Sequence, residues 1–125
     1  MKKSFKNLEM MGMLQELRPL LSHRDKVGYA AARNTRVFTQ SLTEYMAVRD
    51  RLIEKYGEPD RDTGGNETGT ISLKTDSPKF NAFIEELEPF NDMSHEVELM
   101  TLKYEEVIGI LSGEEILSID WMLSD

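Results

Sequence analysis

Residues Asp25–Gly57 read DKVGYAAARNTRVFTQSLTEYMAVRDRLIEKYG, and this stretch decides the fold. Its apolar side chains recur at spacings of three and four with no proline among them, which predicts one long amphipathic helix that Gly57 ends. At ~1.5 Å per residue such a helix spans roughly 48 Å, so we expect part of it to project or to be covered by a partner. The apolar positions are Val27, Ala31, Phe38, Leu42, Tyr45, Leu52 and Tyr56.

A shorter helix is predicted before it, over residues 7–18. Asn7 is a plausible N-cap, and Pro19 should end the helix because its ring removes a backbone donor and clashes with the preceding turn. Two helices joined by a short link predict an antiparallel helical hairpin over residues 1–56. The apolar stripe of the first helix consists of Leu8, Met11, Leu14 and Leu17.

The composition changes after Gly57. Residues 57–69 are rich in Gly, Asp, Asn and Pro, which predicts an exposed loop. Alternation of apolar and polar residues over 70–74 predicts a short strand, and the same pattern over 97–101 predicts a second strand that pairs with the first.

Two further helices are predicted in this half. Ser77 before Pro78 is typical of a helix start, and Pro89 should end that helix. Ser112 and Glu115 have the spacing of a capping box, and Trp121 in the helix that follows should anchor the core. We therefore predict a single α+β domain over residues 1–125: the hairpin over 1–56, the loop over 57–69, and over 70–125 an α+β part with a small two- or three-stranded antiparallel sheet and short C-terminal helices.

The composition limits the class of protein. The chain has 125 residues, 30% of them charged, and no cysteine. Absence of cysteine removes disulfides, thiolate nucleophiles and cysteine-ligated zinc, and it is typical of a reducing compartment. No apolar run approaches ~18 residues, and the first residues do not resemble a signal peptide. We expect a soluble protein of the cytoplasm with no membrane partner.

The net charge of −8 conceals an asymmetry along the chain. Residues 1–56 hold eleven Lys/Arg against six Asp/Glu, whereas residues 57–125 hold four against seventeen, so the two parts carry +5 and −13. Basic and acidic residues alternate along the long predicted helix, which favours a solvated face over nucleic-acid binding. The acidic half either pairs internally with the basic half or presents a negative surface to a basic partner.

Motifs for catalysis or metal binding are missing. Asp60, Asp62 and Gly65 match three positions of a calcium loop, but Gly64 and Ile71 stand where an oxygen ligand and a bidentate glutamate are required. The two histidines, at positions 23 and 95, lack the spacing of a zinc site or a catalytic triad. We expect no enzyme activity, no cofactor and no metal.

The order of these segments resembles a family of small uncharacterised proteins of tailed phages and prophages that infect Gram-positive bacteria. The resemblance covers nearly the whole chain, and it carries no catalytic residues. It rests on Asn7-Leu8, on Gly28-Tyr29-Ala30-Ala31-Ala32-Arg33-Asn34, on Arg49-x-Arg51-Leu52-Ile53-x-Lys55-Tyr56-Gly57, on Phe80-Asn81, on Val97-Glu98-Leu99 and on the C-terminal Leu-Ser-x-x-x-Ile-Leu-x-x-x-Trp-Met-Leu segment.

The resemblance implies two binding roles within the host cell. One is a module that engages and inhibits a host defence protein such as a nuclease, in the manner of an anti-CRISPR protein, with an acidic surface against a basic channel. The other is a morphogenesis or tail-assembly protein that forms a homo-oligomer through the Asp25–Tyr56 helix. For the first role, the acidic residues predicted to contact the basic partner are Glu85, Glu86, Glu88, Glu96 and Glu98.

Overall fold

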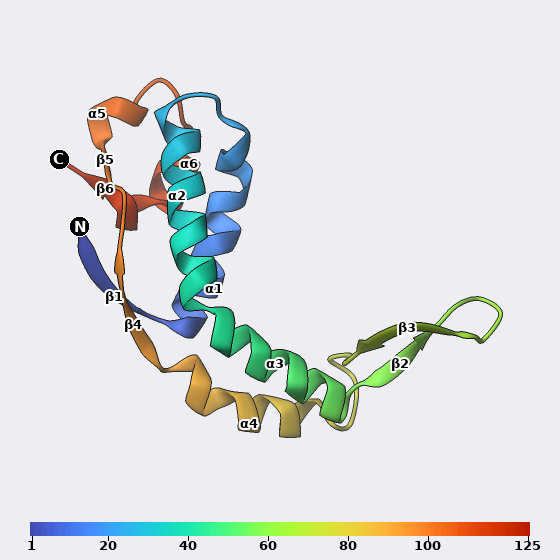
Figure 1. Cartoon of the computed structure of the whole chain (residues 1–125). Coiled ribbons are helices and arrows are strands. Elements are labelled where there is room, and N and C mark those ends of the chain that lie inside the picture. Colours follow the sequence, from blue (N-terminus) through green and yellow to red (C-terminus); the bar gives the residue numbers. More distant parts are fainter. The chain divides into compact units, whose positions relative to one another are not determined.

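The computed structural model describes residues 1–125 and divides them into two compact units (Figure 1). Unit 1 consists of Met1–Leu42 and Ser94–Asp125, and unit 2 consists of Thr43–Met93. Each unit combines helices with short paired strands, so the chain belongs to the α+β class.

The elements of unit 1 come from both ends of the chain. They are β1 (Lys2–Lys6), α1 (Asn7–Leu17), the 3-10 helix η1 (Arg18–Ser22), α2 (Lys26–Ser41), β4 (Ser94–Glu98), β5 (Leu102–Lys103), α5 (Tyr104–Val107), α6 (Gly113–Ser118), the 3-10 helix η2 (Asp120–Met122) and β6 (Leu123–Ser124). The elements of unit 2 are α3 (Thr43–Tyr56), β2 (Glu58–Arg61), β3 (Glu67–Ser72) and α4 (Phe80–Asn91).

The prediction of one long helix over Asp25–Gly57 is wrong. Asp25 caps α2, since its carboxylate accepts the Val27 N–H at 3.0 Å, but α2 ends at Ser41 and α3 begins at Thr43. Between them the backbone of Leu42 has φ −88° and ψ −1°, outside the usual α-helical values. The apolar periodicity continues across this break because Leu42 and Tyr45 are both buried, so the pattern alone does not reveal it.

A short helical hairpin takes the place of the long one. Helices α1 and α2 of unit 1 pack side by side and run in opposite directions (Figure 1). Near the start of α2, Ala30 and Ala31 are fully buried, and a Cβ on Gly28 would overlap the backbone carbonyl of His23 in the preceding link. The N-cap of α1 is Lys6 and not Asn7, because the Lys6 N–H donates to the Glu9 carboxylate at 2.9 Å.

The predicted pairing of strands is also wrong. Strand β4 pairs antiparallel with β1, in a register that places Lys2 opposite Glu98 and Lys6 opposite Ser94. Strand β3 instead pairs antiparallel with β2, so most of the expected loop over residues 57–69 is a β-hairpin. Antiparallel neighbours joined by a short turn form more readily than pairs separated by a helix.

Unit 1 contains most of the buried core. Seventeen of the twenty buried apolar side chains of the chain belong to it. At its centre Phe5 from β1, Phe38 from α2 and Trp121 from η2 form an aromatic cluster with ring centroids 5.5 to 6.3 Å apart. The Trp121 indole N–H donates to the Glu16 carboxylate at 2.8 Å, so Trp121 joins the start of the chain to its end.

The C-terminal segment of unit 1 begins with the predicted capping box. The Glu115 N–H donates to the Ser112 hydroxyl at 3.1 Å, and the Ser112 N–H donates to the Glu115 carboxylate at 3.0 Å. These reciprocal bonds satisfy two backbone donors at the start of α6. The expected terminal helix is shorter than the pattern indicated, because α6 ends at Ser118 and gives way to η2.

Unit 2 is a pair of antiparallel helices joined by the β2–β3 hairpin (Figure 1). Its buried apolar side chains are Tyr45, Phe83 and Leu87. Pro89 does not end α4, which continues to Asn91. Pro89 is exposed, and so is Glu85, the residue four positions earlier whose carbonyl loses its helical hydrogen bond.

Gly57 does end α3, as predicted. A Cβ at this position would lie 2.5 Å from the Ile53 carbonyl oxygen and 2.8 Å from the Ser72 carbonyl oxygen. Only glycine leaves room for β3 to pass this close to the end of α3. The residue therefore sets the approach of the hairpin to the helix.

Candidate binding surfaces

The five acidic residues predicted to contact a partner do not belong to one element. Glu85, Glu86 and Glu88 lie on α4 in unit 2, and Glu96 and Glu98 lie on β4 in unit 1. All five are exposed. Because they come from different units, we treat the α4 and β4 groups as separate surfaces.

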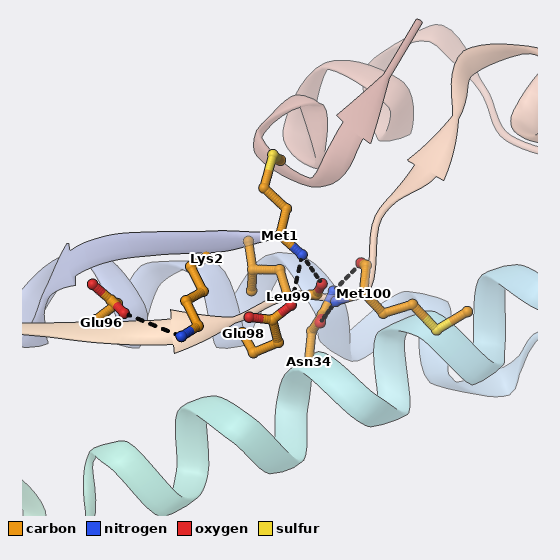
Figure 2. Close-up of polar contacts among 7 residues, drawn as sticks. All are labelled: Met1, Lys2, Asn34, Glu96, Glu98, Leu99 and Met100. Atoms are coloured by element: carbon orange, nitrogen blue, oxygen red, sulfur yellow. Dashed lines mark hydrogen bonds and ion pairs between the residues drawn. The ribbon is translucent and has the colours of Figure 1, made fainter.

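The β4 group is paired with the start of the chain. The amino group of Met1 lies 3.0 Å from the Glu98 carboxylate and also donates to the Leu99 carbonyl at 3.0 Å (Figure 2). On the same face the Lys2 ammonium lies 3.9 Å from the Glu96 carboxylate. Each carboxylate therefore faces a cation of its own unit, which reduces its attraction for an outside cation.

A buried asparagine fixes the backbone just after β4. Asn34 of α2 is fully buried, its amide nitrogen donates to the Met100 carbonyl at 3.0 Å, and its amide oxygen accepts the Met100 N–H at 2.9 Å (Figure 2). This reciprocal pair satisfies both backbone groups of Met100. No sequence pattern marks Asn34 as a functional or structural residue, because its hydrogen-bond partner Met100 is 66 residues away.

The α4 group contains one paired carboxylate. Glu86 accepts hydrogen bonds from the Lys55 ammonium at 3.0 Å and from the Tyr56 hydroxyl at 2.5 Å. The Tyr56 hydrogen bond, followed by that of Lys55, holds the pKa of Glu86 below its usual value. The same contact with Glu86 raises the pKa of both Lys55 and Tyr56. This three-residue cluster connects α3 to α4.

Glu85 and Glu88 form neither a hydrogen bond nor an ion pair, although both are exposed. They lie three residues apart on α4, and positions three apart on a helix are neighbours. No lysine or arginine occurs between residues 80 and 98 to neutralise them locally. They are therefore the members of the predicted set that are free to receive a cation from a partner.

The net charges of the two units differ from the net charges of the two halves of the sequence. Unit 1 holds nine Lys/Arg against eleven Asp/Glu, a balance of −2, because its two segments have opposite charge. The Lys26–Glu106 pair, with its N–O distance of 2.5 Å, is one bond between those segments. Unit 2 holds six against twelve, a balance of −6. The excess negative charge therefore belongs mainly to unit 2.

A groove of about 350 Å³ lies between α3 and α4 of unit 2. Its apolar lining is formed by Val48 and Leu52 of α3 and by Phe90 of α4, all of them half-buried. Charged side chains complete the lining, namely Arg51 and Lys55 from α3 and Glu86 from α4. An apolar floor with a charged margin is a feature of surfaces that bind other proteins.

A larger and more polar cavity, of about 550 Å³, lies beside the β2–β3 hairpin. In its wall the Asp60 carboxylate accepts the hydroxyls of Thr70 at 2.7 Å and Ser72 at 2.8 Å, which lower the pKa of Asp60. Asp62 accepts the N–H groups of Gly64 and Asn66 and so shapes the turn. In this structure the two aspartates of the calcium-like pattern organise the hairpin.

The two histidines of the chain lie in different segments of unit 1. His23 lies 3.8 Å from the capping residue Asp25, and His95 lies on β4 opposite Phe5. No group of three or more His, Cys, Asp or Glu side chains is placed to hold a metal ion. Tyr104 donates to the Asp120 carboxylate, and this bond raises the pKa of Tyr104.

Sequence reasoning missed the α3–α4 groove and the Lys55–Tyr56–Glu86 cluster. The residues that form them are about thirty positions apart, and no local motif marks them. None of the helices is both long enough and apolar enough to span a membrane. No family model, curated protein or solved structure matches the chain.

Proposed function

We propose that the chain is a non-catalytic protein-binding module and that unit 2 is its binding part. The observation that carries the proposal is the pair of unpartnered, exposed carboxylates of Glu85 and Glu88 on α4, the same helix that lines the apolar groove. Apolar contact area flanked by unpaired charge supports a site for a protein with basic side chains.

The partner that fits this chemistry is a protein with a basic surface, such as a nucleic-acid-handling host protein. Proteins that bind phosphate backbones carry clustered Lys and Arg, and an acidic module competes for the same surface. The resemblance to phage proteins of Gram-positive bacteria supports a host defence protein such as a nuclease, inhibited in the host cytoplasm. Electrostatic attraction makes such a complex form quickly and weaken with salt.

The experiment is a pull-down from a lysate of a Gram-positive host with the wild type and two charge-reversal variants. One variant carries Glu85→Lys and Glu88→Lys on α4. The matched control carries Glu105→Lys and Glu114→Lys, which make the same change in net charge at exposed positions of unit 1. Both variants are first checked for an unchanged melting temperature.

We expect the wild type and the control to recover the same protein and the α4 variant to lose it. Added duplex DNA should release that protein if its basic surface is a nucleic-acid site. Equal recovery by all three forms, with the same salt dependence, would contradict the α4 surface.

An assembly role is the second candidate. The sequence predicts that it uses a continuous helix over Asp25–Tyr56, whereas α2 and α3 are separate helices. Self-association is supported instead by the α3–α4 pair of unit 2, because this pair buries few of its own apolar side chains and leaves others to be covered. A closed dimer is compatible with a binding module, whereas a large defined oligomer favours assembly.

A further inference from the structure

The α3–α4 groove leaves apolar side chains of unit 2 incompletely covered. Val48, Leu52 and Phe90 are only half-buried in its floor, and Met93 beyond the end of α4 is 50% exposed. Only three apolar side chains of this 51-residue unit are buried. A pair of helices with this little buried area gains stability when a second pair covers it.

Helical spacing shows which residues border the groove. On α4, Glu86 and Phe90 form the row of side chains that lines the groove. The next row outward has the same spacing of four residues and consists of Glu85 and Pro89, with Met93 beyond the end of the helix. On α3, Arg51 and Lys55 form the lining row. Among the charged residues that line the groove, those of α3 are therefore basic and that of α4 is acidic.

Two of these marginal charges are unused within the chain. Lys55 and Glu86 neutralise each other across the groove at 3.0 Å. Arg51 of α3 and Glu85 of α4 are both exposed and form no ion pair or hydrogen bond. They have opposite charge and lie on opposite sides of the groove.

We propose that a second copy of the chain docks on this groove, so that the two α3–α4 pairs form a four-helix arrangement about a two-fold axis. In a contact with two-fold symmetry every pair of contacting residues occurs twice, once with each copy supplying the first residue. When the two-fold axis runs along the groove, parallel to the helices, α3 of each copy faces α4 of the other. The basic side chains of α3 then meet the acidic side chains of α4 on both sides of the contact. Arg51 of one copy then lies on the same edge of the contact as Glu85 of the other, about five residues along the helix axis, so the two long side chains can attract each other there.

This inference rests on the proposed function, because it names an occupant for the same binding part. The second copy covers the apolar floor until a basic partner displaces it. Dimerisation and partner binding are consequently in competition, and dilution of the dimer should raise the apparent affinity for the partner.

The test is sedimentation equilibrium of the full chain across the micromolar range, with two single variants and their mixture. In its own dimer Arg51→Glu brings two carboxylates together at each contact, and Glu85→Arg brings two guanidinium groups together there. An equal mixture of the two variants restores an Arg–Glu pair at both contacts. Arg33→Glu, at an exposed position of α2 in unit 1, is the matched control.

We expect the wild type and Arg33→Glu to dimerise and each groove variant to bind itself at least about tenfold more weakly. The mixture should recover the dimer, and high salt should reduce the difference among the forms. The recovery also excludes misfolding, because a variant that fails to fold cannot be rescued by the other. A monomeric wild type, or groove variants that dimerise like the wild type, would overturn the proposal.

The two proposals fail separately. If the wild type is a monomer that still recovers a basic protein through Glu85 and Glu88, only the self-association is wrong. If the chain dimerises through Arg51 and Glu85 but no basic partner depends on α4, the protein-binding function is wrong and the dimer stands.

Discussion

Unit 1 buries seventeen apolar side chains in 74 residues, whereas unit 2 buries three in 51. The charges differ in the same direction, with −2 on unit 1 and −6 on unit 2. Burial of apolar area is the main source of folding free energy, and net charge opposes a compact state. We therefore expect unit 1 to be the more stable of the two units.

The largest effect should follow from charging the core of unit 1. Leu42 is 1% exposed, and Leu42→Asp places an unpaired carboxylate among apolar side chains, so we expect a loss of about 4 kcal/mol in the free energy of unfolding. Denaturant unfolding measures it. Leu117→Asp is the control, since Leu117 is 77% exposed in α6 and its substitution should cost little. Equal losses for the two variants would mean that the core of unit 1 is placed wrongly.

A smaller loss is expected from Asn34→Ala, which leaves both backbone groups of Met100 without partners inside unit 1. We expect about 2 kcal/mol, because buried polar groups that lose their hydrogen bonds retain the cost of desolvation. Asn81→Ala, at an exposed position of α4, is the matched control in unit 2. If Asn34→Ala melts like the wild type, the segment after β4 is held by other contacts.

Unit 2 should be loosened by Gly57→Ala. The added methyl group would meet two carbonyl oxygens at 2.8 Å or less, and we expect the hairpin to shift at a cost of about 1 to 2 kcal/mol. Gly12→Ala in α1 is the opposite control: outside the backbone of its own helix no atom lies within 4 Å of an added Cβ, so the change should stabilise unit 1 by about 0.5 to 1 kcal/mol. Proteolysis sites mapped by mass spectrometry should increase within 43–93 for Gly57→Ala only.

The smallest effect concerns pH and the link between α3 and α4. The pKa of Glu86 is lowered in the folded chain, so its contribution is complete above the usual glutamate pKa of 4.5 and disappears as the pH falls through the lowered value. Glu86→Gln should remove that part of the acid sensitivity of unit 2. Chemical shifts of α3 and α4 amides followed by NMR during acid titration measure it, and an identical titration in both forms would exclude the contribution.

The sequence was sufficient for some local interactions but not for all, since Asn7 is not the N-cap of α1 and Pro89 does not end α4. The Gly57 stop and the Ser112–Glu115 capping box involve a single backbone requirement or residues three apart, and both are present. The break at Leu42 was not predictable, because it lacks proline or glycine and the apolar periodicity continues across it. The five acidic positions stay a prediction of a partner surface. Their division between the units and the pairing of Glu86, Glu96 and Glu98 were not predictable, because both depend on long-range contacts.

The pairing of β1 with β4 shows the same limit. Lys2, Ser4 and Lys6 alternate with Lys3 and Phe5, a pattern with little apolar character. The strand forms because β4 supplies backbone partners about ninety positions away and because Phe5 joins the aromatic cluster. Neither reason is visible within five residues of sequence.

Hydrogen exchange of the full chain, followed by mass spectrometry at low and high protein concentration, tests the difference between the units most directly. Amides of α3 and α4 should exchange faster than those of α2 at low concentration, because few buried contacts oppose their opening. At high concentration α3 and α4 should become protected while α2 stays unchanged, since a second copy then covers the groove. Equal protection of α2, α3 and α4 at both concentrations would contradict the difference in stability between unit 1 and unit 2.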